Sequence, residues 1–286
     1  MKILITGASG TLGLPLTLQL LREHKVSAIV RDPGKLSKAH INLFEGDITD
    51  FTFVNKTVSA VTPDVVVHLA AIVSKACDDD PALTELVNVK ATENLASAAI
   101  SAGATKFIFP STAAIYDLQN TEPNKESDSS PQSVYGKSKF AAERRLLEIS
   151  QDSAMNVAVL RIFNVYGPGI HGSLINKLVN STQDSPVELT DPEHFVRDYV
   201  NINDLIKVFR AFIDADLQGY NIYNVASGHP YSTTEIISQL KVDGIKAFYK
   251  ITVNDSPSTS KADVNKLKKL LGFLPQTNLD FRGIKI

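Results

Sequence analysis

The chain has 286 residues, 43% of them hydrophobic, and its 29 Lys and Arg residues nearly balance its 31 Asp and Glu residues. The single cysteine excludes an internal disulfide scaffold, and a formal net charge of -2 offers no basic surface for nucleic acid or anionic membranes. This length predicts one large or two modest globular domains, each able to bury a core.

The first apolar run reaches Gly7 after only a few residues, which is too short for a signal-peptide core. No apolar run approaches about 18 residues, the length that a membrane helix needs. We therefore expect a cytoplasmic protein that binds neither nucleic acid nor membranes.

Strand-like and helix-like segments alternate through the first 165 residues. Short β-branched runs predict strands at residues 2–6, 26–30, 42–45, 65–69, 106–110 and 157–161, with helical patterns between them at 14–24, 51–59, 81–102 and 135–150. This alternation predicts an α/β fold with a doubly wound parallel Rossmann sheet, covered by helices on both faces.

After residues 166–169 the predicted elements become short and are interrupted by Gly, Pro, Asn and Ser. A strand at 196–202, a helix at 204–215 and a strand at 221–225 still suit the first domain. We therefore predict a Rossmann domain over residues 1–165, to which 196–226 partly return. Residues 166–286 are predicted to form a smaller substrate-binding region.

The first predicted strand leads into the sequence TGASGTLG at residues 6–13, a GxxGxxG turn that opens into a helix. Glycines allow a tight reversal and close approach of the backbone to a pyrophosphate, and the helix start supplies free N–H groups. The turn therefore predicts a bound dinucleotide, with contacts from Gly7, Ser9, Gly10, Thr11, Leu12 and Gly13.

The second predicted strand ends at Arg31-Asp32, where the side chain decides between the two nicotinamide dinucleotides. A carboxylate there bonds the ribose 2′-hydroxyl of NAD, whereas an arginine suits the 2′-phosphate of NADP. Because Arg31 comes first, we predict NADP. In the alternative, Asp32 binds the ribose of NAD and Arg31 is a solvated charge.

Two further strand ends are predicted to border the cofactor. Asp47 follows the third strand, where its carboxylate can bond the adenine amino group, with Ile48 beside it. Small residues follow the fourth strand and permit close approach of the backbone. The predicted contacts there are Leu69, Ala70 and Ala71.

Tyr135 and Lys139 are four residues apart at the start of a predicted helix, so they share one helix face. A nearby ammonium favours the phenolate, which predicts a lowered pKa for Tyr135 and a role in proton transfer. Ser111 and Thr112 end the fifth predicted strand, where an open α/β sheet places its ligand crevice.

These segments together resemble the extended short-chain dehydrogenase/reductases of the NAD-dependent epimerase/dehydratase family. The similar stretches cover most of the chain and lie at residues 6–13, 46–48, 68–71, 88–92, 110–116, 135–139, 160–169, 197–200 and 223–228. The resemblance implies a nucleotide-activated sugar as substrate, a carboxyl-terminal substrate domain and a role in polysaccharide biosynthesis.

The resemblance also implies residue roles. Tyr135 is the expected acid/base, Lys139 binds the nicotinamide ribose and tunes the tyrosine, and Thr112 holds the reacting sugar oxygen. The other implied contacts are Asn88 for the cofactor and Ser111, Asn164 and Arg197 for the substrate.

The residues after Thr112 narrow the reaction. The family's dehydratases resemble one another in carrying an Asp-Glu pair there, whereas this chain has Ala113-Ala114, whose methyl groups transfer no protons. We predict an NADPH-dependent 4-keto-sugar reductase. The alternatives are a 4-epimerase that retains NAD and a non-catalytic NADP-binding regulatory subunit.

Three further expectations concern the substrate, metals and assembly. The family often carries an arginine before the segment 262–267, but residues 254–261 contain none, so either Lys261 replaces it or the substrate lacks a standard nucleotide diphosphate. No His pair has a ligand spacing and Cys77 stands in a polar run, so no metal is expected. The resemblance implies a homodimer through helices 81–102 and 135–150.

Overall fold

The structure is a computed structural model that describes residues 1–252 and 258–284. The chain forms two compact units. Unit 1 comprises Met1–Ile115, Pro131–Arg161 and Phe209–Tyr223, and unit 2 comprises Tyr116–Ser130, Ile162–Val208 and Asn224–Ile286. Residues 116–130 therefore belong to unit 2, although they precede the predicted boundary at residue 165. The predicted boundary at residue 165 remains a prediction for the functional domains.

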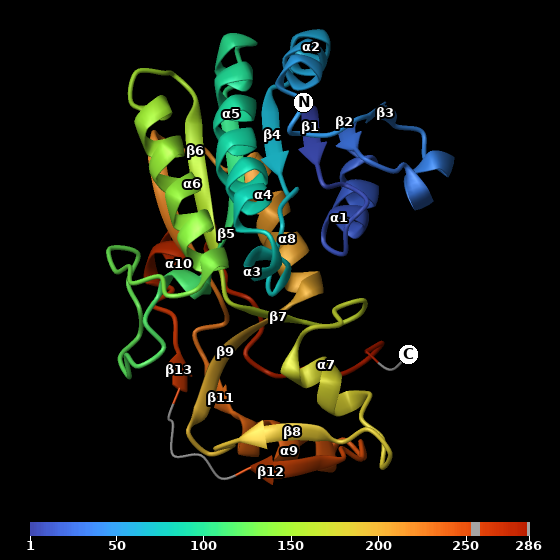
Figure 1. Ribbon diagram of the computed structural model, residues 1–286, viewed down its shortest axis with the longest axis vertical. Helices are drawn as coiled ribbons and strands as arrows, with labels where there is room; N and C mark the ends of the chain where they lie inside the picture. The colour runs from blue at the N-terminus through green and yellow to red at the C-terminus, as the bar shows by residue number, and fades with distance from the viewer. Residues whose placement is uncertain (253–257, 285–286) are drawn as a thin grey trace. The chain divides into compact units, whose positions relative to one another are not determined.

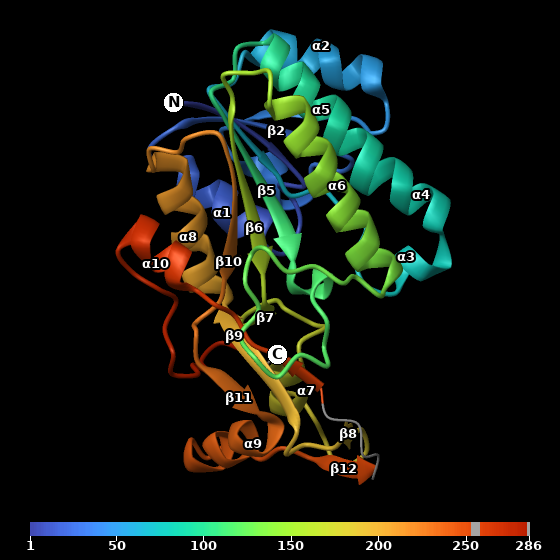
Figure 2. The ribbon, with the colours of Figure 1, turned by 90° about the vertical axis from the view of Figure 1, so that its left-hand side faces the viewer.

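Unit 1 is built on a seven-stranded sheet in the order β10-β6-β5-β4-β1-β2-β3 (Figures 1 and 2). Its strands are β1 (Lys2–Thr6), β2 (Lys25–Val30), β3 (Asn42–Glu45), β4 (Val65–His68), β5 (Lys106–Thr112), β6 (Asn156–Ile162) and β10 (Tyr220–Val225). The neighbouring pairs from β3 to β5 are parallel. The predicted doubly wound Rossmann sheet is confirmed.

The helices of this sheet lie on both of its faces (Figure 2). On one face are α2 (Phe51–Val61), α5 (Ala91–Ser101) and α6 (Val134–Ser150), and on the other are α1 (Gly13–Leu20) and α8 (Ile202–Asp214). The short helices α3 (Ala76–Asp79) and α4 (Pro81–Glu85) precede α5. Both sheet faces are therefore shielded from water, as the apolar strands require.

The helix predicted at 81–102 is divided in the structure. A π-helical turn over Leu86–Lys90 separates α4 from α5. The apolar spacing stays helix-like through this turn, so periodicity alone predicts one continuous helix. Such π turns are frequent at functional sites.

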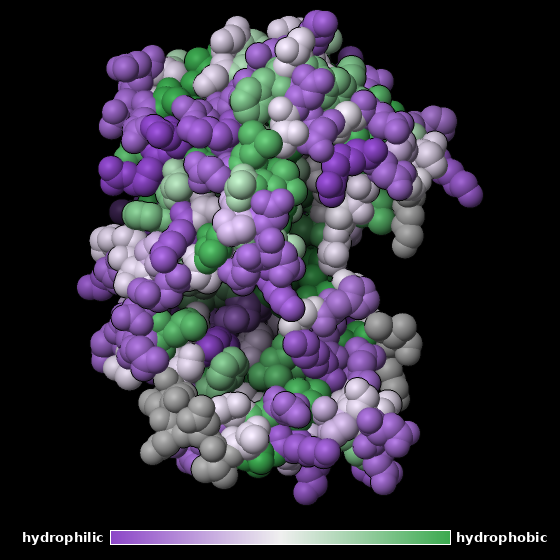
Figure 3. Space-filling view, in the orientation of Figure 1, coloured by the Kyte–Doolittle hydropathy of each residue, from purple (hydrophilic) through white to green (hydrophobic). Residues whose placement is uncertain are grey.

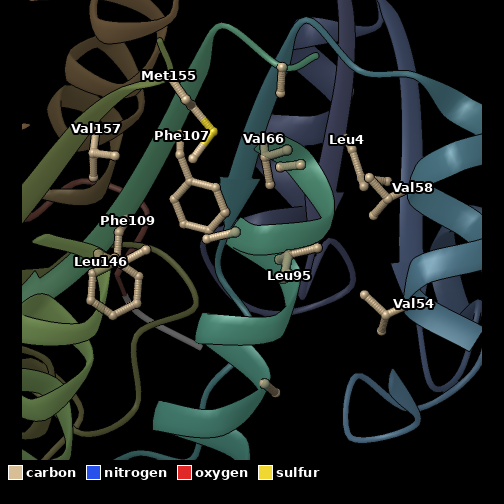
Figure 4. Close-up of a cluster of buried hydrophobic side chains, with 14 of the residues drawn as sticks. Leu4, Val54, Val58, Val66, Leu95, Phe107, Phe109, Leu146, Met155 and Val157 are labelled. Atoms are coloured by element: carbon tan, nitrogen blue, oxygen red, sulfur yellow. The ribbon is translucent and has the colours of Figure 1, made fainter. Parts of the chain in front are cut away.

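One apolar cluster of the core of unit 1 lies between the sheet and its α2-α5-α6 layer, as Figure 4 shows. Leu4, Val66 and Phe107 come from three neighbouring strands and are fully buried. They pack in one cluster with Val54, Val58, Leu95, Leu146 and Met155. This cluster anchors the strands whose carboxyl ends carry the predicted site.

Unit 2 contains β9 (Phe195–Asn201), which pairs with β7 (Asn164–Tyr166), β11 (Pro230–Ser232) and β13 (Ser258–Ser260). A separate parallel pair joins β8 (Val187–Thr190) and β12 (Tyr249–Thr252). Its helices are α7 (Leu174–Val179), α9 (Thr233–Val242) and α10 (Asn265–Leu271). A second apolar cluster, including Tyr166, Ile175 and Leu240, forms its core.

Hydrophilic residues cover most of the face drawn in Figure 3. Within residues 1–252 and 258–284, no helix is both long and apolar enough to cross a membrane.

Candidate active site

The glycine-rich turn follows β1 and leaves no room for side chains. Gly7 adopts a φ of +68°, and a Cβ there would lie 2.6 Å from the backbone nitrogen of Ala70. A Cβ on Gly13 would lie 2.1 Å from the carbonyl oxygen of Gly7. No side chain caps the start of α1. The turn thus has the close backbone approach and free helix start that suit a pyrophosphate.

Pro15 sits in the first turn of α1 rather than in its interior. The N–H groups of a first turn have no partner within the helix, so the missing donor breaks no helical hydrogen bond there.

A cavity of about 370 Å³ in unit 1 opens beside this turn. Ten residues predicted to contact the cofactor line it, namely Gly7, Ser9, Gly10, Arg31, Asp32, Asp47, Ile48, Leu69, Ala70 and Ala71. Leu83 and Val87, whose contribution the sequence did not suggest, also line it. Leu83 is 44% exposed, a property of the folded chain that the sequence does not show. These residues fit a dinucleotide.

Three acidic or basic side chains border this cavity. Asp32 Oδ1 accepts a hydrogen bond from the Gly34 N–H at 2.9 Å. Asp47 Oδ1 accepts from the N–H and hydroxyl of Thr49, both at 2.8 Å. The Thr49 backbone bond is the main cause that lowers the pKa of Asp47, and the charge of Arg31 adds to it. Each carboxylate therefore keeps one oxygen outside these bonds.

A chain of hydrogen bonds ties the glycine turn to the end of β4. Thr92 Oγ1 donates to the Asn88 carbonyl, so it accepts from His68 Nε2 at 2.9 Å. His68 Nδ1 then accepts from Thr6 Oγ1 at 2.6 Å, and Thr6 Oγ1 accepts from the Ala70 N–H at 3.2 Å. Burial, with the charge of Lys139, lowers the pKa of His68 to about 3. The imidazole is therefore neutral, and its two hydrogen bonds connect Thr6, which precedes the glycine turn, to Thr92 of α5.

Asn88 lies in the π turn, and its side chain is occupied by the protein itself. Its Oδ1 accepts from the Ile72 N–H at 2.8 Å, and its Nδ2 donates to the Ile72 carbonyl and to Ser138 Oγ. Ser138 in turn donates to the Tyr135 carbonyl at 2.8 Å. Asn88 therefore connects a cavity-lining loop to the start of α6, while its direct contact with a cofactor stays a prediction.

Thr112 ends β5, and Tyr135 lies in the first turn of α6. The Thr112 side chain acts on the Tyr135 hydroxyl and opposes the rise in the pKa of Tyr135 that burial causes. Gly136 makes this approach possible, because a Cβ at that position would lie 2.3 Å from the Ala114 carbonyl oxygen. The structure thus brings together two of the three predicted catalytic residues.

Burial decides the charges of the predicted catalytic pair. It raises the pKa of Tyr135 to about 12, against the opposing hydrogen bond from Thr112. It also lowers the pKa of Lys139 to about 7. The predicted lowering of the Tyr135 pKa by Lys139 is therefore wrong for the protein alone, because the buried lysine itself holds its proton weakly. The Lys139 ammonium lies 3.9 Å from the centre of the Phe109 ring.

Two further side chains near this pair carry information. Ser111 is buried, and its hydroxyl has no partner among the described residues. An unpartnered buried hydroxyl at a strand end suits its predicted contact with a substrate. Cys77 is fully buried, and its charge state influences both Tyr135 and Lys139. Its polar sequence surroundings had suggested no such location.

Asn164 and Arg197 belong to unit 2. Asn164 Nδ2 donates to the Asp198 carbonyl at 2.9 Å. The Arg197 guanidinium stacks 3.7 Å over the Phe195 ring and donates to the Val196 carbonyl, the Ser258 carbonyl and the Ser258 hydroxyl. Burial lowers the pKa of Arg197 to about 10, so it stays charged. Of its five N–H groups, two remain outside these bonds to the described residues.

The carboxylate of Asp198 accepts hydrogen bonds from the N–H and hydroxyl of Ser227 and from the Gly228 N–H. Burial nevertheless raises its pKa to about 6.

Residues 254–261, which precede segment 262–267 and contain no arginine, lie partly outside the described residues, which omit 253–257. Lys261 is described, and its carbonyl accepts two hydrogen bonds from Asn124. Across the described parts of the chain, no three His, Cys, Asp or Glu side chains form a group that could hold a metal ion.

Comparison with known proteins adds independent information. The sequence model of the NAD dependent epimerase/dehydratase family matches residues 3–226. UDP-glucose 4-epimerase of Vibrio cholerae is 29% identical over 97% of this chain and 92% of that protein. GDP-6-deoxy-D-talose 4-dehydrogenase of Aggregatibacter actinomycetemcomitans is 30% identical over 84% of this chain and 79% of that protein. The solved structure of MoeE5 in complex with UDP-glucose and NAD has a TM-score of 0.85 at 26% identity, and the match covers 98% of this chain and 95% of that one.

Proposed function

Because the chain belongs to the NAD dependent epimerase/dehydratase family, we propose that it oxidises and reduces C4 of a nucleotide-activated sugar and acts as a 4-epimerase. The family membership that the motifs predict is confirmed, and with it an enzyme of the NAD(P)-dependent oxidoreductase type. The V. cholerae relative is a UDP-glucose 4-epimerase, and MoeE5 binds UDP-glucose and NAD. Both support a UDP-sugar as substrate, and the MoeE5 complex supports NAD as cofactor.

The observation that carries the proposal is the placement of Thr112 at the end of β5 and of Tyr135 in the first turn of α6, where Thr112 acts to lower the pKa of Tyr135. Lys139 lies one turn further along α6. Both hydroxyls can contact the same sugar oxygen. Tyr135 then removes or returns the proton of that oxygen, while Thr112 donates a hydrogen bond to the oxygen. NAD(P), when bound, exchanges the hydride, and its oxidised ring carries a positive charge that favours the phenolate.

The residues next to Thr112 limit the reaction. Ala113 and Ala114 form a 3₁₀ turn after β5, and the Ala114 N–H donates to Thr112 Oγ1 at 3.1 Å. Neither side chain can act as an acid or base, so water elimination has no catalyst at these positions. Hydride transfer at the carbon that bears the reacting oxygen is the chemistry that remains.

A 4-keto-sugar reductase, the function predicted first from the sequence, is the second candidate. Arg31 favours it, because this exposed arginine borders the cavity at the end of β2, where a 2′-phosphate would lie. The 4-dehydrogenase relative also supports reversible chemistry at C4. Asp32 argues for NAD, since its second oxygen remains outside its bond to Gly34.

The nicotinamide retained by the purified protein separates the two candidates. We expect NAD after denaturation, and interconversion of UDP-glucose and UDP-galactose without added cofactor, followed by ¹H NMR of the anomeric protons. A protein that purifies empty, requires NADPH and consumes it with a 4-keto sugar would establish the reductase instead. The proposal would be contradicted if the protein showed neither the epimerase nor the reductase activity with UDP-sugars.

Arg31→Gln tests the predicted NADP preference. If Arg31 binds the 2′-phosphate, the substitution raises the Kd of NADPH about 10-fold or more, because a charge-assisted hydrogen bond is lost. The Kd of NADH stays unchanged, as measured by nicotinamide fluorescence. Arg22→Gln, at an exposed arginine of the same unit, is the matched control. Equal effects on both cofactors would make Arg31 a general surface charge.

A further inference from the structure

Helix α6 carries a third buried ionisable residue in line with the catalytic pair. Tyr135, Lys139 and Glu143 follow one another at intervals of four residues, so they share one helix face. Lys139 and Glu143 are each 2% exposed. The proposed mechanism uses the first two and leaves a fully buried carboxylate without a role.

Arg161 at the end of unit 1's part of β6 holds this carboxylate. Its Nε lies 3.1 Å and 3.3 Å from the two Glu143 oxygens, and its Nη2 lies 2.8 Å from Oε2. The Tyr220 hydroxyl donates to the backbone carbonyl of Glu143 at 3.0 Å. Both the side chain and the backbone of Glu143 are therefore fixed in place.

Stability alone explains this arrangement poorly. Burial of two ions costs hydration free energy that their mutual attraction hardly offsets. Apolar residues of similar volume at such positions commonly give the protein equal stability. A buried ion pair next to a buried lysine does, however, act on that lysine through a low dielectric. Burial lowers the pKa of Lys139 to about 7, and Glu143 makes the largest contribution that opposes this lowering.

Building on the proposed function, we propose that Glu143, held by Arg161, is a positioning residue whose carboxylate keeps the Lys139 ammonium charged beside Tyr135 and so sets the upper pH limit of turnover. Arg161 keeps that carboxylate in position, because its charged guanidinium contacts both carboxylate oxygens.

The other groups around Lys139 come from different elements. Cys77 of α3 favours the ammonium only as a thiolate, and burial raises the pKa of its thiol. His68 of β4 is neutral, and Phe109 of β5 contributes only its ring face. Tyr135 precedes Lys139 on its own helix and holds its proton. Among the described residues, Glu143 is therefore the carboxylate whose charge favours the Lys139 ammonium.

The direct test is the titration of Lys139, which needs neither substrate nor turnover. In protein labelled with ¹³C at lysine Cε, the resonance lost in Lys139→Met identifies the group. We expect a midpoint near 7 in the natural protein and a midpoint about one pH unit lower, or more, in Glu143→Gln. Glu148→Gln, on the exposed side of the same helix, should leave it unchanged.

Enzyme kinetics supply the second measurement. The alkaline limb of the kcat/KM profile should move to lower pH in Glu143→Gln by the same amount as the Lys139 midpoint, with the acidic limb unchanged. If the protein turns over no UDP-sugar, the titration still decides the role of Glu143, so failure of the proposed function and failure of this inference are distinguishable.

Glu143→Gln removes the carboxylate charge beside the buried Arg161 guanidinium and can prevent folding. The double variant Glu143→Gln/Arg161→Met removes both charges, and it should place the Lys139 midpoint between those of the natural protein and Glu143→Gln. A folded single or double variant whose Lys139 midpoint matches that of the natural protein would overturn the proposal and leave the pair a purely structural one.

Discussion

Tyr135 keeps its proton in the protein alone, because burial raises its pKa to about 12. This state suits donation to a keto oxygen without further change. Removal of a proton from a sugar hydroxyl requires a lower pKa, which a nearby positive charge provides. The spacing of Tyr135 and Lys139 suggested that the lysine alone lowers the pKa of Tyr135. We expect instead that the bound cofactor and Lys139 together provide the positive charge that lowers it.

Tyr135→Phe tests the acid/base role. We expect kcat/KM to fall about 10²- to 10⁴-fold, because the proton-transfer group is lost while the ring remains. The Kd of NADH should stay within about twofold of the natural value. Tyr249→Phe, at a tyrosine that is 40% exposed, is the control. A variant altered only in cofactor affinity would favour the non-catalytic regulatory subunit.

His68 makes stability depend on pH. Its pKa is about 3 in the folded protein and 6.5 in an unperturbed histidine. Below pH 6.5 the unfolded chain therefore binds a proton that the folded chain does not, so the free energy of unfolding decreases as the pH falls from 6.5 toward 3. The slope from this group approaches about 1.4 kcal/mol per pH unit.

The comparison with His68→Gln isolates this contribution, because other groups are shared. Urea unfolding at pH 7 and pH 5.5 should show a larger loss of stability for the natural protein than for the variant. Asp198, whose pKa burial raises to about 6, acts in the opposite direction in both proteins and cancels. Equal pH slopes in the two proteins would contradict a neutral, buried His68.

At the scale of elements, α6 is positioned by a contact that helix propensity opposes. Gly136 lies in its first turn, where alanine would favour the helix by about 1 kcal/mol. The Ala114 carbonyl, however, leaves no space for a Cβ. Close packing of α6 on the turn after β5 is therefore what sets the distance between Thr112 and Tyr135.

Gly136→Ala should consequently lower stability by about 1–3 kcal/mol rather than raise it, since overpacking displaces the helix. Displacement of α6 should move Tyr135 relative to Thr112, so the fold decrease in kcat should exceed the fold change in the Kd of the cofactor. Urea unfolding and steady-state kinetics measure both effects. Lys137→Ala, at the exposed next position, serves as the control, and a stabilised, fully active Gly136→Ala would disprove the contact.

The strand predictions agree closely with the structure, whereas the helix predicted at 81–102 does not. Residues 2–6 and 42–45 match β1 and β3. Strands are short, and their β-branched composition and flanking turn residues are local signals. The π turn at Leu86–Lys90 has no such signal, because Asn88 satisfies partners at Ile72 and Ser138 that only the folded chain brings near.

At the scale of the whole molecule, the predicted homodimer remains to be tested. Two alanines of α5, which falls within one of the two helices implied at the interface, do not reach it, since Ala96 and Ala99 are fully buried in the core of unit 1. Sedimentation equilibrium at micromolar concentration should give a mass twice the 31.1 kDa of one chain. A single-chain mass over the whole concentration range would exclude the dimer.

The sequence by itself determined the order of strands and helices, the glycine turn and the shared face of Tyr135 and Lys139. Each of these depends on periodicity or steric demands within a few neighbouring residues. Tertiary structure alone decided which distant groups meet, such as Thr6 with His68 and Glu143 with Arg161. It also decided the charge of each buried group, because desolvation depends on everything packed around a side chain and not on its neighbours in the chain.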